Sequence, residues 1–475
     1  MQPISLLAFA ACALSVHGAA LMNFTYVEST DSFLNATLEI DQFFYTNADE
    51  SASFYTRVYN RASDEGTELL TGCPLIYMKR GDTVNVTVVN NLGDETQTYD
   101  TLNSYHYANV TNLHTHGLHV SSNTPQDNVL MSIEPGTQYT YSYTVPDDHA
   151  GGTHWYHAHH HGSTAIQVGG GLLGAIIVAD EEDEVPAAFW GMDELVLLIH
   201  NVPVSDLLSK FLSTTGDALY ESGRNSVLGG TTFCLVNGQY QPTATVSAGE
   251  WTRLRVIFSG LETTLELQMT SDSASCEWQL LARDGIYVSP APRTFGDTMF
   301  MAPGSRADVK VAQSTILSIT VEASTITMED LPLFTPNRPN YLATVNDYAS
   351  PVDTTIVFGG AAASCTINSG QWVAGGYSVG SMESGSVQRF TMQGEDKHPF
   401  HVHVNSFQLA GVTDATGYYT SGDWGDVLYE FTDVTISSYY FPVDTFVSKA
   451  VIHCHFLPHE DLGCMGYMDI TGTAG

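Results

Sequence analysis

The amino-acid sequence predicts an all-β protein made of several sandwich domains. Short runs rich in Val, Ile, Thr and Tyr recur along the chain and are separated by Gly, Asn, Asp and Pro. Long segments with the 3.6-residue apolar period of a helix are scarce. This combination is typical of β-sandwiches and barrels. The clearest runs cover residues 83–89, 138–145, 254–258, 316–321 and 450–455.

The number of domains follows from the chain length and from a weak internal repeat. A chain of 475 residues is longer than one ordinary domain. Gly81, Gly249 and Gly385 each precede an alternating run, as expected of a turn that leads into a strand. The boundaries fall near the acidic stretch 181–186 and near residues 346–352. The three expected domains cover residues 21–182, 183–345 and 346–475.

The first twenty residues predict export. Residues 4–16 form an apolar stretch that is followed by Gly18, Ala19 and Ala20, as in a secretory signal peptide over residues 1–20. A buried N-terminal helix is the alternative. No later stretch reaches the ~18 apolar residues that span a membrane, so we expect a secreted protein, or a periplasmic one in a bacterium. Four sequons predict glycans if the host glycosylates, and are chance matches otherwise: Asn23, Asn35, Asn85 and Asn109.

The charge balance excludes one class of partner. The sequence has 52 Asp and Glu against 16 Lys and Arg, a net charge of -36 at pH 7. Nucleic-acid binding needs clustered Lys and Arg, so we expect no nucleic-acid partner, and an anionic membrane surface is equally unsuited. The 18 histidines outnumber Lys and Arg together, which indicates that imidazole serves a purpose other than charge.

The positions of the histidines carry the strongest signal. Side chains two residues apart on a strand point to the same face, so a His-x-His pair presents two imidazoles side by side. No histidine lies between His200 and His398, so the middle domain supplies no imidazole ligand. We therefore expect the pairs to converge between the first and last domains and to hold a cluster of metal ions. The four pairs are His114/His116, His157/His159, His401/His403 and His453/His455.

A second metal site is indicated around Cys454, which lies between His453 and His455. If both histidines face the cluster, Cys454 faces the opposite way. A thiolate with two imidazoles is the ligand set of a blue-copper centre, and His398 and His459 are the imidazoles left once the pairs are assigned. This donor set favours copper over calcium or magnesium. Zinc is chemically possible, but a zinc ion could not use the Cys454 thiolate for electron transfer.

At these residues the sequence resembles the multicopper oxidases. Four motifs match in chain order, at residues 114–117, 155–159, 398–403 and 453–455, the last followed by His459. The middle domain has family-like strands at 235–238 and 302–308, so that the resemblance covers roughly residue 75 to the C-terminus. It implies three cupredoxin-like Greek-key β-sandwich domains and four copper ions per chain.

The resemblance also implies a role for each ligand. The type 1 copper would take His398, Cys454 and His459, and the type 2 copper would take His114 and His401. The type 3 pair would take His116, His157 and His455 on one ion, and His159, His403 and His453 on the other. A reducing substrate would give single electrons near the type 1 site, and four electrons passed through Cys454 would reduce dioxygen to two waters.

Two acids complete the implied site. Oxygen reduction consumes protons, so the cluster needs acidic groups within reach. Asp127, eleven residues after His116, matches the family's acid near the type 2 copper. Glu460, directly after His459, matches the acid of bacterial cuprous oxidases, spore-coat laccases and bilirubin oxidases. Two surface acids among 52 are the alternative interpretation.

The sequence departs from its relatives at the axial type 1 position, five residues after His459. Relatives with a His-Glu-Asp ending usually have Met there, whereas this chain has Cys464 followed by Met465. Cys464 could bind copper as a second thiolate, or point toward it weakly as a thiol. Met465 could instead bind after a one-residue shift, which would leave Cys464 free or in a disulfide. We expect Cys464 in the axial place, without a strong bond.

The reducing substrate is open at this point. A laccase-like oxidase of phenols or aromatic amines is the leading hypothesis, and a metallo-oxidase of Fe(II), Mn(II) or Cu(I) is its rival. The net charge of -36 would attract cations, but an acidic surface suited to a salty medium explains it equally. A non-catalytic copper-binding relative would be expected to lose ligands, and all motif ligands stand here. Three domains complete the cluster within one chain, so we expect a monomer.

Overall fold

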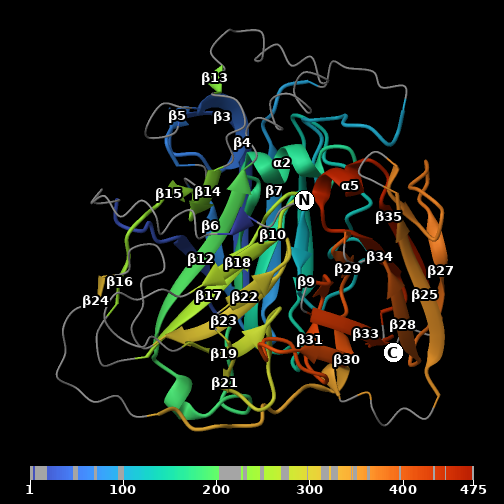
Figure 1. Ribbon diagram of the computed structural model, residues 1–475. Helices are drawn as coiled ribbons and strands as arrows, with labels where there is room; N and C mark the ends of the chain where they lie inside the picture. The colour runs from blue at the N-terminus through green and yellow to red at the C-terminus, as the bar shows by residue number, and fades with distance from the viewer. Residues whose placement is uncertain are drawn as a thin grey trace.

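The computed structural model describes most of the chain as a set of packed β-sheets (Figure 1). Within the described residues, no helix is long and apolar enough to cross a membrane. The described residues are 4–5, 19–46, 52–68, 72–94, 101–202, 226–227, 233–246, 251–268, 278–296, 298–311, 320–321, 330–343, 345, 350–360, 364–394, 397–431, 434–443 and 446–472. Cys12, Cys276, residues 316–319 and most of the predicted signal peptide lie outside them.

Two sheets form the first third of the chain. One has the strand order β13-β4-β3-β7-β9 with β5 beside β3, and the other has the order β2-β6-β11-β10-β8. Strands β3 and β7 alternate buried and more exposed residues, because each turns one face toward the core between the two sheets. The elements are β2 (Thr25–Glu28), β3 (Phe33–Thr46), β4 (Ala52–Tyr59), β5 (Glu65–Gly66), β6 (Pro74–Met78), β7 (Thr83–Asn90), β8 (His114–His116), β9 (Gln138–Thr144), β10 (Gly152–His157), α2 (Thr164–Gly170) and β11 (Leu173–Val178).

The middle third is built around one large sheet with the order β15-β14-β12-β17-β23-β19-β20, in which β21 also pairs with β19. Strands β1, β18 and β22 form a smaller sheet, and β16 pairs with β24. The elements are β1 (Ile4–Ser5), η1 (Ala187–Phe189), β12 (Asp193–Val202), β13 (Ser226–Val227), β14 (Phe233–Val236), β15 (Gln239–Tyr240), β16 (Thr245–Val246), β17 (Thr252–Phe258), β18 (Leu265–Gln268), β19 (Trp278–Arg283), β20 (Ile286–Tyr287), β21 (Arg293–Thr294), β22 (Thr298–Met301), β23 (Arg306–Val311), β24 (Thr320–Val321) and η4 (Asn340–Leu342).

The last third again has two sheets, with the orders β26-β25-β28-β33-β30-β31 and β27-β35-β34-β29-β32. Its core is continuous with that of the middle third, whereas the first third has a core largely of its own. The elements are β25 (Val352–Gly359), β26 (Thr366–Ile367), β27 (Ser378–Glu383), β28 (Val387–Gln393), β29 (Phe400–Val402), β30 (Phe407–Asp414), β31 (Trp424–Gly425), β32 (Val427–Leu428), β33 (Val434–Pro442), β34 (Lys449–Cys454), α5 (Leu457–Asp461) and β35 (Met465–Thr471).

The all-β prediction is confirmed, and the few helices are short. Helices α2 and α5 meet where the first and last thirds of the chain adjoin, near the top of Figure 1. One short strand crosses between the expected domains, because β13 of the middle third pairs with β4 of the first. Strand β1, which lies within the predicted signal peptide, pairs with β18 of the middle third. The domain boundaries and the signal peptide stay predictions. Asn109 of one sequon is buried, and its Oδ1 accepts hydrogen bonds from Arg57, so a glycan at this residue would not fit the folded chain.

Candidate metal centre

The first two His-x-His pairs lie on adjacent strands. Strand β8 carries His114 and His116, and β10 ends at His157. The two strands pair antiparallel, with His157 opposite His114 and Trp155 opposite His116. His159 follows β10, where its backbone N–H donates to the side chain of Asn112 at 2.8 Å. All four imidazoles are buried.

The last two pairs repeat this arrangement at the other end of the chain. His401 lies on β29 opposite His453 on β34, while Cys454 pairs with Phe400. His403 follows β29, and its N–H donates to Val451 O at 2.8 Å. Because the side chains of successive strand residues alternate, His453 and His455 point away from the side that Cys454 faces.

The structure brings the four pairs together, as the sequence predicts. The rings of His114 and His403 stack at 3.9 Å between centroids, and so do those of His116 and His401. Each stack therefore joins one histidine from the first third of the chain to one from the last third. We call these eight residues the histidine cluster: His114, His116, His157, His159, His401, His403, His453 and His455.

The nitrogens of the cluster converge as metal ligands would. His453 Nε2 lies 3.3 Å from His159 Nε2 and 3.4 Å from His403 Nε2, the triad expected for one type 3 ion. In the other expected triad, the ring of His116 lies 5.8 Å from that of His157 and 5.2 Å from that of His455. Several inward nitrogens lack any hydrogen-bond partner within the described residues: His114 Nε2, His116 Nδ1, His157 Nε2, His401 Nε2, and both ring nitrogens of His455.

These residues fit copper. Buried polar atoms are normally hydrogen-bonded, so a group of orphaned imidazole nitrogens points to a missing ligand. Burial lowers the pKa of His157 to about 3 and that of His159 to about 4, which keeps both rings neutral and able to bind a metal. The assignment of each histidine to a particular ion stays a prediction.

The type 1 residues form a second group on the other side of β34. Cys454 Sγ lies 3.6 Å from Nδ1 of His398 and of His459, and these two nitrogens lie 3.1 Å apart. All three side chains are buried. Burial raises the pKa of the Cys454 thiol well above its ordinary value, so a bound cation is needed to hold it as a thiolate.

A disulfide corrects one expectation at this site. Cys464 does lie beside His398 and Cys454, with the three ligand atoms within 4.8 Å of one another. However, its sulfur is bonded to Cys365, 99 residues earlier in the chain. A disulfide sulfur carries no thiolate charge, so in this form Cys464 supplies neither the thiolate nor the thiol that the sequence analysis considered. Cys365 was not foreseen there, because neither spacing nor motif connects it to Cys464.

Met465 is also not placed as the axial ligand. It lies opposite His453 in the β34–β35 pairing, so it faces away from the side of Cys454. Its side chain packs with Val129, Val451 and Tyr467. The Cys365–Cys464 disulfide, rather than Met465, lies beside the type 1 residues, with Cys365 Sγ 3.3 Å from His398 Nδ1.

The two predicted acids both contact the histidine cluster. Asp127 Oδ2 lies 2.7 Å from His114 Nδ1, and its Oδ1 accepts hydrogen bonds from the backbone and hydroxyl of Thr115. Burial raises the pKa of Asp127 to about 7, although the Thr115 hydrogen bonds oppose this. Glu460 bridges two histidines, with Oε1 at 3.2 Å from His159 Nδ1 and Oε2 at 3.1 Å from His453 Nδ1.

The neighbours of Glu460 determine its charge. Burial raises the pKa of Glu460, but His159 and His453 together lower it to about 2. The adjacent Asp461 accepts hydrogen bonds from the backbone N–H groups of Gly162, Thr164 and Ala165 at the start of α2. Asp461 therefore fastens α5 to α2 and keeps Glu460 between the two histidines. Asp461 directly follows Glu460, but it belongs to no ligand motif, so its role appears only in the fold.

Two further residues near the histidine cluster and the type 1 group could not be identified from the sequence. Asp426 Oδ1 lies 3.2 Å from His116 Nε2, and the Asp426 carbonyl accepts a hydrogen bond from His401 Nδ1 at 2.7 Å. Glu262 Oε1 lies 3.9 Å from His459 Nε2, and the side chain of Glu262 is 28% exposed, which makes it an acid at the solvent side of the type 1 group. Neither residue belongs to a motif, so only the fold could reveal them.

The remaining histidines of the first third surround the centre without completing it. His154 and His149 are buried, and the ring of His119 stacks on Tyr341 at 3.9 Å. His160 contacts Ser132, and His161 contacts Asn103. His119 and His154 are thus buried, and His160 and His161 are half-buried.

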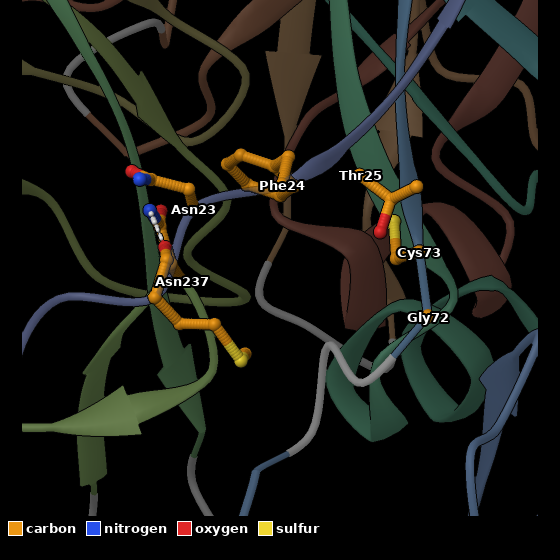
Figure 2. A pocket seen from close by; sticks show the side chains of 7 residues that line it. Asn23, Phe24, Thr25, Gly72, Cys73 and Asn237 are labelled. Carbon is orange, nitrogen blue, oxygen red and sulfur yellow. Dashed lines mark hydrogen bonds between the residues drawn. The ribbon is translucent and has the colours of Figure 1, made fainter.

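Figure 2 shows a pocket that is lined by residues from the first and middle thirds of the chain. Asn237 Nδ2 donates a hydrogen bond to the carbonyl of Met22 at 3.1 Å beside it. None of the predicted ligands lines this pocket, so it is not part of the candidate metal centre. Its lining residues are Met22, Asn23, Phe24, Thr25, Gly72, Cys73 and Asn237.

Both ends of the chain are similar to the same family of known proteins. Two family models described as multicopper oxidase match residues 71–183 and 337–472. The chain is 25% identical over 406 residues to a multicopper oxidase of Staphylococcus aureus, covering 84% of this chain and 82% of that protein. Among solved structures, it is similar to a laccase from Pediococcus acidilactici, with a TM-score of 0.71, 20% identity, and coverage of 96% of this chain and 95% of that one. It is equally similar to a multicopper oxidase from Campylobacter jejuni described as a metallo-oxidase, with a TM-score of 0.69, 20% identity and 96% coverage of both chains.

Proposed function

Because the chain belongs to the multicopper oxidase family, an oxidoreductase family that uses dioxygen, we propose that it takes single electrons from a phenol or an aromatic amine and uses them to reduce dioxygen to water. Copper bound at the type 1 residues and at the histidine cluster supplies the one-electron redox chemistry. By analogy with the family, we propose four ions per chain. The described residues offer ten buried histidines and Cys454 for them.

The observation that carries the proposal is the position of Cys454 on β34. Its side chain joins the type 1 group, while His453 and His455 on either side of it belong to the histidine cluster. With copper bound at both places, an electron that entered at the type 1 group would pass to the cluster through Cys454 and the adjoining His453 or His455. No motion of the protein is needed, because the route is covalent from Cys454 to each histidine.

Electrons would enter at the edge of His459. Its Nε2 faces Glu262, which is partly open to solvent, whereas its Nδ1 faces Cys454. A carboxylate at this place can accept a hydrogen bond from a phenol hydroxyl or from the N–H of an aromatic amine. It would hold the substrate beside the imidazole and take up the proton that leaves with the electron.

The two buried acids would have different roles in oxygen reduction, because Glu460, whose pKa is lowered to about 2, stays ionised near neutral pH. Asp127 has a pKa raised to about 7, so near neutral pH it can hold and release a proton beside His114. Glu460 bridges His159 and His453 on the other side of the cluster. We propose that Asp127 supplies protons beside His114, and that the ionised Glu460 orients His159 and His453.

A metal ion is the second candidate substrate, and Glu262 favours it too. A carboxylate at the type 1 edge would attract Fe(II), Mn(II) or Cu(I), and the net charge of -36 would steer cations toward the protein. The similar structures include both a laccase and a metallo-oxidase, so their names do not separate the two substrates.

We also propose that the protein is exported and is a monomer. The apolar stretch 4–16 supports export, and a cluster completed within one chain supports a monomer.

The test is dioxygen uptake by the copper-loaded protein with a phenol, an aromatic amine, Fe(II), Mn(II) or Cu(I). The proposal expects turnover of the phenol. Strong turnover of a metal ion with none of the organic substrates would overturn the preference. A protein that binds a single copper and consumes no dioxygen would overturn the oxidase assignment.

The variant Glu262→Gln sharpens this comparison, because the amide keeps a hydrogen-bond acceptor but loses the charge. Phenol oxidation should then fall less than metal-ion oxidation. The matched control is Glu383→Gln, which removes the same charge from an exposed position on β27.

A further inference from the structure

The middle third of the chain supplies no imidazole to the copper centre, but it supplies a guanidinium. Arg306 starts β23 and is fully buried. A tight turn precedes it, closed by the hydrogen bond from Ser305 N–H to Ala302 O at 3.0 Å. This turn brings Gly304 so close to the cluster that a Cβ there would lie 2.7 Å from His455 Nε2.

Every N–H of the Arg306 guanidinium has a partner. Nε donates to Thr153 O, Nη1 donates to Gly304 O, and Nη2 donates to Asp284 O. The remaining N–H of Nη1 and of Nη2 each donate to one carboxylate oxygen of Asp426, both at 2.6 Å. A planar guanidinium whose five donors are all satisfied is held in one orientation, and its two hydrogen bonds to Asp426 fix the orientation of that carboxylate.

Asp426 passes this orientation to two histidines of the cluster. Its Oδ1 lies 3.2 Å from Nε2 of His116, and its backbone carbonyl accepts a hydrogen bond from Nδ1 of His401 at 2.7 Å. The two rings stack on each other at 3.9 Å and 11°, although one comes from the first third of the chain and the other from the last. Their free nitrogens are therefore different ones, Nδ1 in His116 and Nε2 in His401.

We propose that Arg306 is a positioning residue of the copper centre, which fixes through Asp426 the ring nitrogen that His116 and His401 each turn toward the metal. The partner of the outer nitrogen of a ligating histidine sets its tautomer and ring orientation. Here the carboxylate of Asp426 does this for His116 and the backbone carbonyl of Asp426 does it for His401, while Arg306 holds the carboxylate. The middle third, which supplies none of the candidate metal ligands, thus completes the centre from outside the ligand set. This inference rests on copper binding by the histidine cluster, and it does not depend on the reducing substrate.

The test compares two buried arginines of the same sheet. Arg306→Lys keeps the charge but has too few donors to hold Asp426, Thr153, Gly304 and Asp284 together. Arg253→Lys on the adjoining strand β17 is the control, because Arg253 is equally buried and ion-paired, but with Asp180 and Asp308 rather than with a residue that contacts the cluster.

Three properties are measured on copper-loaded protein: the type 1 absorption, the electron paramagnetic resonance signal of the type 2 copper, and the copper kept after dialysis against a chelator. We expect Arg306→Lys to keep the type 1 absorption, to change the type 2 signal, and to weaken copper retention by the cluster about 10- to 100-fold. Arg253→Lys should lower the melting temperature alone. Wild-type signals and retention in Arg306→Lys would overturn the proposal, and so would equal changes in both variants.

A second variant serves if Arg306→Lys does not fold, which its missing type 1 absorption would reveal. Asp426→Asn keeps the oxygen that faces His116 and the carbonyl that faces His401, but it loses the ion pair with Arg306. A changed type 2 signal is expected, and an unchanged one would overturn the proposal. The proposed function fails in a different way, because then the wild-type protein itself would bind no cluster copper.

Discussion

The substitution Gly304→Ala isolates the contact between the middle third of the chain and the histidine cluster. A Cβ at residue 304 would lie 2.7 Å from His455 Nε2, about 0.7 Å short of an ordinary contact of 3.4 Å, and 3.1 Å from His116 Cε1. Residue 304 has φ +89°, which is costly for alanine by about 1–2 kcal/mol. Overpacking adds about 1–3 kcal/mol, and because His455 must move, we expect cluster copper to be lost as well.

The control for this prediction is Gly136→Ala. Gly136 has a similar φ of +74°, but nothing lies within 4 Å of its added Cβ, so the variant carries the backbone strain without the clash. Calorimetry and elemental copper analysis of both variants give the comparison. The reasoning is refuted if Gly304→Ala binds as much copper as the wild type and its melting temperature falls no further than that of Gly136→Ala.

Three further predictions address the type 1 group, the acids and the α2–α5 contact. Cys365→Ser frees the thiol of Cys464 beside Cys454, so the type 1 absorption and potential should change, and an unchanged spectrum would show that the disulfide is irrelevant to that ion. In metal-free protein the pKa of Asp127 is raised from 3.8 to about 7, so between these values the folded state holds a proton that the unfolded state has lost. Stability should therefore fall as pH rises through this window, and Asp127→Asn should remove that slope in urea unfolding. Asp461→Ala removes the acceptor for three N–H groups at the start of α2 and should destabilise the protein by about 1–2 kcal/mol, measured by the same unfolding assay.

The parts of the centre that could be predicted from the sequence are those set by local geometry. The two-residue period of a strand places His114 and His116 on one face, and the distribution of the four His-x-His pairs predicts that they converge from the two ends of the chain. Which strands pair with one another is seen only in the structure. Asp127 and Glu460 could be predicted from the sequence because they stand at fixed distances from ligand motifs.

What could not be predicted depends on contacts between distant segments. Asp426 is 310 residues from His116, and Arg306 is 120 residues from Asp426, so no spacing in the sequence connects them. The same holds for Cys365 and Cys464, which lie 99 residues apart. Glu262 comes from the middle third, which carries no ligand motif, so no feature of the sequence connects it to His459.

The division of the histidine cluster between the two ends of the chain has a consequence for biosynthesis. His159 and His453 are 294 residues apart, so a chain that is still being made has at most half of the imidazoles for most of its synthesis. Copper can find the full cluster only after the last strands have emerged and docked. An ion that binds only the finished fold stabilises that fold by mass action. Copper loading would therefore stabilise the contact between the first and last thirds of the chain as the last step of folding.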